Sequence, residues 1–158
     1  MNISGGKMQP YYRLIATPPS GWTVDDEATE KYGVQMLVPK GKTFGDAPAL
    51  IYVKVSYRQK DTDQAQFIKT SNDSWLEKVP DAKITKMPDV VRANGKPAFQ
   101  LYQYVNPSVP KQPFEYLAFG EDSDKDGNTF NLMITVSGGN RKVIEKAAGA
   151  YTEFLKAH

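Results

Sequence analysis

The sequence predicts an α+β fold, with an antiparallel sheet of about six or seven strands covered by helices in an α/β/α sandwich. Two observations predict this class. Most strand-like segments follow one another with short connections, which favours hairpins over parallel crossovers. Only two segments keep a helical spacing of apolar residues over several turns.

The N-terminal third contains three predicted strands. Residues 11–16 are rich in strand-forming side chains and end before Pro18 and Pro19, which predicts an edge strand. Residues 33–38 alternate between apolar and polar side chains. Residues 49–58 alternate most clearly, so we expect one face of that strand to be buried.

A helix is predicted between Asp63 and Val79. Asp63 can cap its first turn, and Pro80 stops it. Apolar residues recur between these limits at helical spacing. They are Ile68, Trp75, Leu76 and Val79.

Two hairpins follow this helix. Asn94-Gly95 separates Val90-Val91 from the β-prone run 98–105, and this dipeptide favours a type I′ turn, which needs two residues with positive φ. The second hairpin joins residues 114–119 to residues 130–136. Along the latter strand, alternate apolar residues predict a buried face.

The last element is a helix that Asn140 can cap. One face of this helix is apolar and the opposite face is charged, so we expect it to pack on the sheet. The apolar residues are Val143, Ile144, Ala147, Ala148, Tyr151, Phe154 and Leu155.

The 158 residues suit a single domain. We expect it to span residues 11–158, with residues 1–10 as a flexible N-terminal segment or an expression remnant. No stretch approaches the roughly 18 apolar residues of a membrane span. Because the chain has no Cys, we expect a periplasmic or exported protein whose signal is missing from this sequence. A cytoplasmic location is the alternative.

Composition excludes several chemistries. The chain has no Cys, and His158 is its only His, which argues against Cys nucleophiles, Ser-His pairs and His/Cys zinc sites. A net charge of +2 is too small to predict nucleic-acid binding. The acidic cluster Asp25, Asp26, Glu27 and Glu30 lacks the apolar pocket that an acid-base pair needs. We therefore expect neither a cofactor nor catalysis.

One local motif predicts a metal site. Asp122, Asp124 and Asp126 precede Gly127 at the spacing of a calcium loop. The twelfth position is Met133 where such loops carry a bidentate Glu, so we expect affinity no tighter than about 10⁻⁴ to 10⁻³ M. The alternative is a solvated hairpin tip.

Three aromatic residues are candidates for contact with another protein. Tyr102 and Tyr104 share one face of their strand, and Trp22 follows Gly21. Tyr and Trp are favoured at the centres of protein interfaces. Packing in the core beneath a helix is the alternative interpretation for all three.

Several local phrases and the order of elements resemble a known family. They are Pro19-Ser20-Gly21-Trp22, Tyr32-Gly33-Val34-Gln35-Met36-Leu37-Val38-Pro39, Gly95-Lys96-Pro97-Ala98, and the hairpin and helix that end the chain. On these features the stretch from Tyr12 to His158 resembles the PsbP-like superfamily. The resemblance implies a non-enzymatic binding protein and assigns no functional residue.

The leading hypothesis is therefore a non-catalytic binding or accessory module that contacts another protein through its surface. A weak calcium-binding or small-ligand-binding protein is the first alternative. An enzyme that uses carboxylates is the second.

Overall fold

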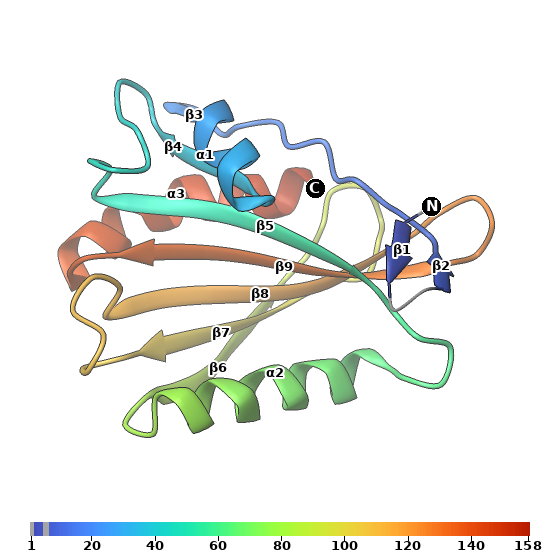
Figure 1. Cartoon of the computed structure of the whole chain (residues 1–158). Helices are drawn as coiled ribbons and strands as arrows, with labels where there is room; N and C mark the ends of the chain where they lie inside the picture. The colour runs from blue at the N-terminus through green and yellow to red at the C-terminus, as the bar shows by residue number, and fades with distance from the viewer. Residues whose placement is uncertain (1, 5–6) are drawn as a thin grey trace.

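The computed structural model describes residues 2–4 and 7–158 and contains a seven-stranded antiparallel sheet with helices on both faces (Figure 1). This arrangement confirms the predicted α+β class. In the predicted flexible segment 1–10, residues 1, 5 and 6 lie outside the described residues. Strands β1 (Asn2–Ser4) and β2 (Lys7–Gln9) pair with each other in a separate small sheet.

The strand order of the large sheet is β3-β4-β5-β9-β8-β7-β6. These strands are β3 (Trp22–Val24), β4 (Gln35–Pro39), β5 (Ala49–Tyr57), β6 (Lys83–Val90), β7 (Phe99–Val105), β8 (Phe114–Ser123) and β9 (Thr129–Gly138). The helices are α1 (Asp26–Tyr32), α2 (Gln64–Lys78) and α3 (Arg141–Ala157). No helix in the described part of the chain is long and apolar enough to cross a membrane.

The predicted helix caps are confirmed. The Asp63 carboxylate accepts the Gln66 N–H at 2.8 Å, and the Asn140 side chain accepts the Val143 N–H at 2.9 Å. Each bond satisfies one of the free N–H groups in a first turn. Asp25 caps α1 in the same way.

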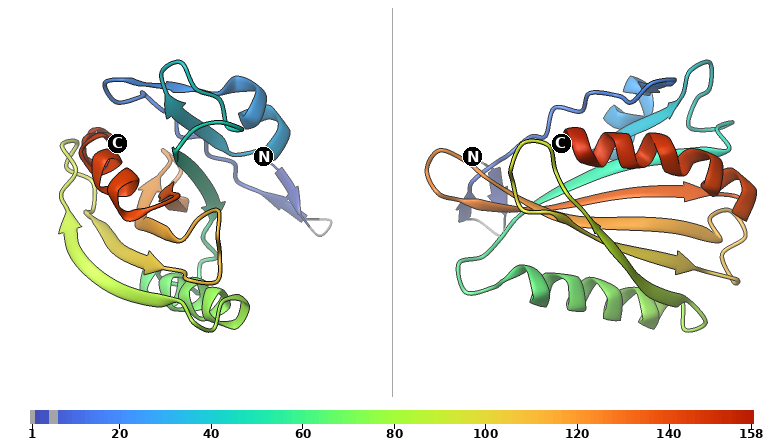
Figure 2. Two further views of the ribbon diagram at one scale, coloured as in Figure 1. Left: turned by 90° about the vertical axis from the view of Figure 1, so that its left-hand side faces the viewer. Right: turned by 180° about the vertical axis from the view of Figure 1, so that it is seen from behind.

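The main core lies between the sheet and α3, around which the sheet bends (Figure 2). Period-two alternation turns one side of β9 toward α3, and every residue on that side is buried. These residues are Phe130, Leu132, Ile134, Val136 and Gly138. Leu132, Ile134 and Val136 meet Tyr151 and Phe154 of α3 in one cluster, as their spacing predicts.

Helix α2 covers the opposite face of the sheet. Its only buried residue is Ile68, which packs with Tyr104, Leu117 and Phe119 in a second, smaller cluster. The two faces of the sheet are therefore covered unequally: α3 presents a broad apolar stripe, whereas α2 presents one buried apolar side chain.

The strand predicted over Tyr11–Ala16 is wrong. This segment is extended but pairs with no strand in the part of the chain that the structure describes. The Gln35 side chain donates to the Leu14 carbonyl and accepts the Ala16 N–H, and Tyr12 stacks on Phe130. Contacts made by side chains, and not the hydrogen bonds of a β ladder, thus fix the position of this segment.

The turn predicted at Asn94-Gly95 is also wrong in type, although β6 and β7 are antiparallel neighbours as expected. Their connection spans residues 91–98, and of the two turn residues only Gly95 has a positive φ. The Asn94 amide instead donates to the main-chain oxygen of His158 at 2.9 Å. Contact with the end of the chain outweighs the local preference for a two-residue turn.

Truncating Phe154 should test the α3 core. Phe154 is 1% exposed, so Phe154→Ala should lower the free energy of unfolding by about 3 to 5 kcal/mol. Urea unfolding measures the change. Lys142→Ala on the exposed side of α3 is the control, with an expected change within about 0.5 kcal/mol. Equal effects of the two substitutions would contradict this packing.

Candidate functional site

The three aspartates of the predicted calcium loop do not converge. Strand β8 continues through Ser123, so Asp122 belongs to the strand and its side chain is buried on the α3 side. Asp124 accepts the N–H groups of Asp126 and Asn128, each at 2.9 Å. Among the described residues no group of three or more His, Cys, Asp or Glu could hold a metal ion. The loop is therefore a hairpin tip.

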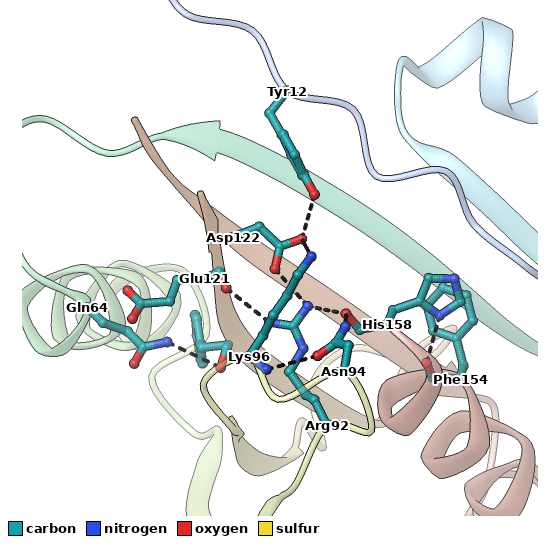
Figure 3. Close-up of polar contacts among 10 residues, drawn as sticks. Tyr12, Gln64, Arg92, Asn94, Lys96, Glu121, Asp122, Phe154 and His158 are labelled. Atoms are coloured by element: carbon teal, nitrogen blue, oxygen red, sulfur yellow. Dashed lines mark hydrogen bonds and ion pairs between the residues drawn. The ribbon is translucent and has the colours of Figure 1, made fainter. Parts of the chain in front are cut away.

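Asp122 forms a buried ion pair with Arg92 (Figure 3). The guanidinium donates to Asp122 Oδ1 at 2.7 Å, to the Glu121 carbonyl at 3.0 Å, and to the main-chain oxygen of His158. Both side chains are inaccessible to solvent. Complementary charge and several hydrogen bonds offset their desolvation.

Two further groups complete the surroundings of this carboxylate. Lys96 Nζ lies 3.3 Å from Asp122 Oδ2, and the Tyr12 hydroxyl donates to the same oxygen at 2.8 Å. His158 also anchors the N-terminal segment, since its Nε2 accepts the Thr17 N–H at 2.9 Å. The network joins the 91–98 connection, β8, the end of α3 and the N-terminal segment.

The aromatic contact candidates divide between core and surface. Trp22 is 8% exposed and joins the α3 core, and Tyr104 is 4% exposed beneath α2. Tyr102 is half-buried, with its ring edge-on to Phe119 and Lys86 Nζ 5.5 Å above it. A side chain must be accessible to contact a partner. Burial argues against that role for Trp22 and Tyr104, and leaves Tyr102 partly accessible.

A cavity of about 300 Å³ lies between the C-terminal half of α2 and the sheet. From α2 it is lined by Ser71, Ser74, Trp75 and Lys78. From the sheet the polar lining residues are Tyr52, Lys54, Tyr104, Glu115 and Thr135. None of these lining residues except Tyr104 was a sequence-based candidate.

The composition of α2 explains why this space is not filled. The residues that α2 turns toward the cavity recur one and two turns apart, but only Trp75 among them is large and apolar. Leu76, predicted as part of the apolar stripe, is 38% exposed. The helix therefore lacks the side chains that would pack its second half onto the sheet.

Glu115 is the buried carboxyl group of the cavity. The strand register places it between Tyr104 of β7 and Ser137 of β9, and it is only 6% exposed. The Asn106 amide donates to Glu115 Oε1 at 3.3 Å, and Asn106 in turn accepts the Trp75 indole N–H at 3.0 Å. Among the ion pairs of the described residues, none includes Glu115.

Burial in the cavity changes the pKa values of Glu115, Tyr52 and Tyr104. Burial raises the pKa of Glu115 to about 7, against the opposing effect of a hydrogen bond with Tyr52. Burial and then the nearby Glu115 charge raise the pKa values of Tyr52 and Tyr104 well above their ordinary range. Near neutral pH the Glu115 carboxyl group can gain or lose a proton, while both tyrosines remain hydroxyl donors.

Sequence reasoning missed Glu115, although a signal for it exists. The strand predicted over residues 114–119 is otherwise apolar or aromatic on both faces, and Glu115 is its only charged residue. A lone acid in a strand that is buried on both faces marks a position where a carboxyl group leaves water.

No protein-family model matches the chain, and no curated protein is similar enough to be a relative. The resemblance to the PsbP-like superfamily therefore stays a prediction. The assignment of a site here depends on its geometry and chemistry.

Glu115 should make the folded state less stable as pH rises. In the unfolded chain its pKa is near 4.5, and folding raises it to about 7. The folded state thus binds the proton more tightly, and this stability is complete below pH 4.5 and lost as pH rises to 7. The loss should be about 3 kcal/mol. Glu115→Gln, which cannot ionise, should lack it, so urea unfolding of both proteins at several pH values should give diverging curves. Parallel curves would contradict the burial of this carboxyl group.

Removing the charge of Asp122 should destabilise the fold strongly. Asp122→Asn leaves the Arg92 guanidinium buried with less compensating charge, at an expected cost of about 3 to 5 kcal/mol. Asp126→Asn, on the exposed hairpin tip, is the matched control and should change stability by less than about 0.5 kcal/mol. Thermal or urea unfolding measures both. A loss for Asp122→Asn as small as for the control would rule out a structural role for the ion pair.

Proposed function

We propose that this chain is a non-catalytic binding protein for a small polar ligand, held in the cavity between α2 and the sheet. One observation carries the proposal: Glu115 is a buried carboxyl group that faces that cavity, and none of the ion pairs among the described residues includes it. A buried ionisable group without a charged partner costs free energy. Such groups in clefts are characteristic of functional sites.

The walls of the cavity support a site with fixed geometry. Trp75 is fixed by its hydrogen bond to Asn106, and the Tyr104 hydroxyl donates to Asn72 of α2. Tyr52 and Tyr104 come from different strands and flank the Glu115 carboxyl group. Small-molecule sites combine aromatic walls with a few fixed polar groups in this way.

This proposal keeps part of the sequence-based hypothesis and changes another part. Binding without catalysis and an exported location, both expected from the sequence, remain within it. The partner changes from a protein surface to a small molecule. Burial of Trp22 and Tyr104 removes two of the three aromatic anchors on which a protein contact was based.

Fragment screening by ¹H–¹⁵N NMR tests the proposal. Fragments that bind should shift the amide signals of Glu115, Thr135 and Ser74 together, because these residues line one cavity. Ser74→Phe, which places a large side chain at the cavity, should abolish those shifts. Ser123→Phe, at an exposed position on β8, is the matched control and should retain them. A screen without shifts at the cavity, or with equal shifts in Ser74→Phe, would refute the site.

A further inference from the structure

The charged residues of the cavity are arranged in a definite order. Glu115 lies at the buried end, whereas Lys54 of β5 and Lys78 of α2 line the same cavity and are exposed. Neither lysine takes part in an ion pair among the described residues. The cavity therefore has a carboxyl group inside, which is negative when ionised, and two positive groups toward solvent.

Resting on the proposed function, we infer that the ligand is a small zwitterion, whose ammonium group lies against Glu115 and whose carboxylate lies toward Lys54 and Lys78. A simple cation would meet repulsion from both lysines, and a simple anion would meet repulsion from Glu115. A molecule with both charges in this order gains an attraction at each end.

The neutral lining residues agree with this orientation. Tyr52, Tyr104 and Trp75 surround the space near Glu115, and aromatic faces attract ammonium groups. The carboxyl group of Glu115 accepts hydrogen bonds from an ammonium group when it is ionised. Charge-assisted bonds of this kind are stronger than neutral ones.

The direction of proton exchange distinguishes this ligand from others. The titratable groups that line the cavity with Glu115 are Tyr52 and Lys54 of β5, Tyr104 of β7 and Lys78 of α2. Burial raises the pKa of Glu115 to about 7, so this carboxyl group can exchange a proton near neutral pH. An ammonium group stabilises the carboxylate, so binding should release a proton from Glu115. A ligand that accepts a hydrogen bond from the neutral acid should instead cause proton uptake.

A series of ω-amino acids provides the probes. These are β-alanine, 4-aminobutyrate, 5-aminovalerate and 6-aminohexanoate, each compared with the alkylamine and the carboxylate of the same carbon chain. At least one zwitterion should bind about tenfold more tightly than both of its partners, the effect of one charge-assisted bond. Isothermal titration at pH 7 in two buffers of different ionisation enthalpy should report proton release.

Substitutions test which residues of the cavity contact each charged group of the ligand. Glu115→Gln should weaken binding of the zwitterion about tenfold and abolish proton release. Lys54→Gln with Lys78→Gln should remove the preference for the zwitterion over its alkylamine. Lys142→Gln, on an exposed part of α3, is the control and should change neither result.

Other outcomes overturn the inference. Tighter binding of a carboxylate, or proton uptake, would identify an anionic ligand. If no ω-amino acid binds while screened fragments do occupy the cavity, the zwitterion is refuted and the proposed function stands. If neither probes nor fragments bind there, both fail.

Discussion

Strand β8 places one buried carboxyl group on each face of the sheet, and the organisation of the molecule depends on how each group is accommodated. Glu115 and Asp122 are an odd number of residues apart, so alternation directs them to opposite faces. Asp122 on the α3 side meets Arg92 and Lys96. Glu115 on the α2 side meets hydroxyl and amide groups, and it takes part in no ion pair within the part of the chain that the structure describes. The chain thus compensates one buried charge and leaves the other next to a cavity.

The α3 side of the sheet, where Arg92 compensates the charge of Asp122, holds distant parts of the chain together. Arg92 belongs to the connection between β6 and β7, yet it bonds β8 and the main-chain oxygen of His158. Tyr12 approaches the same carboxylate from the N-terminal segment. With Phe154 and its neighbours buried beneath, this side has little freedom to rearrange. It gives the strands that line the α2 cavity a fixed frame.

Sequence patterns predicted the elements whose causes are local. The alternation from Phe130 to Val136 and the caps Asp63 and Asn140 depend only on neighbouring residues, and all are confirmed. The failures have tertiary causes. Asn94 bonds to the end of the chain in place of forming a type I′ turn. Asp122 fits the spacing of a calcium loop, but its strand extends further than local propensity indicates, which turns its side chain inward.

The cavity could not be located from sequence, because α2 and several strands bring its lining together and only the register aligns them. Glu115 reaches Tyr104 and Ser137 through pairing with two different strands. Two features that produce the cavity can nevertheless be recognised in the local sequence. A lone Glu in the apolar run 114–119 marks a carboxyl group that is removed from bulk water. A helix with serines and a lysine lining the cavity cannot cover that run by apolar packing. Where these two features meet, the fold leaves a space beside an ionisable group. A ligand that carries a positive charge would fill this space and stabilise the ionised carboxyl group.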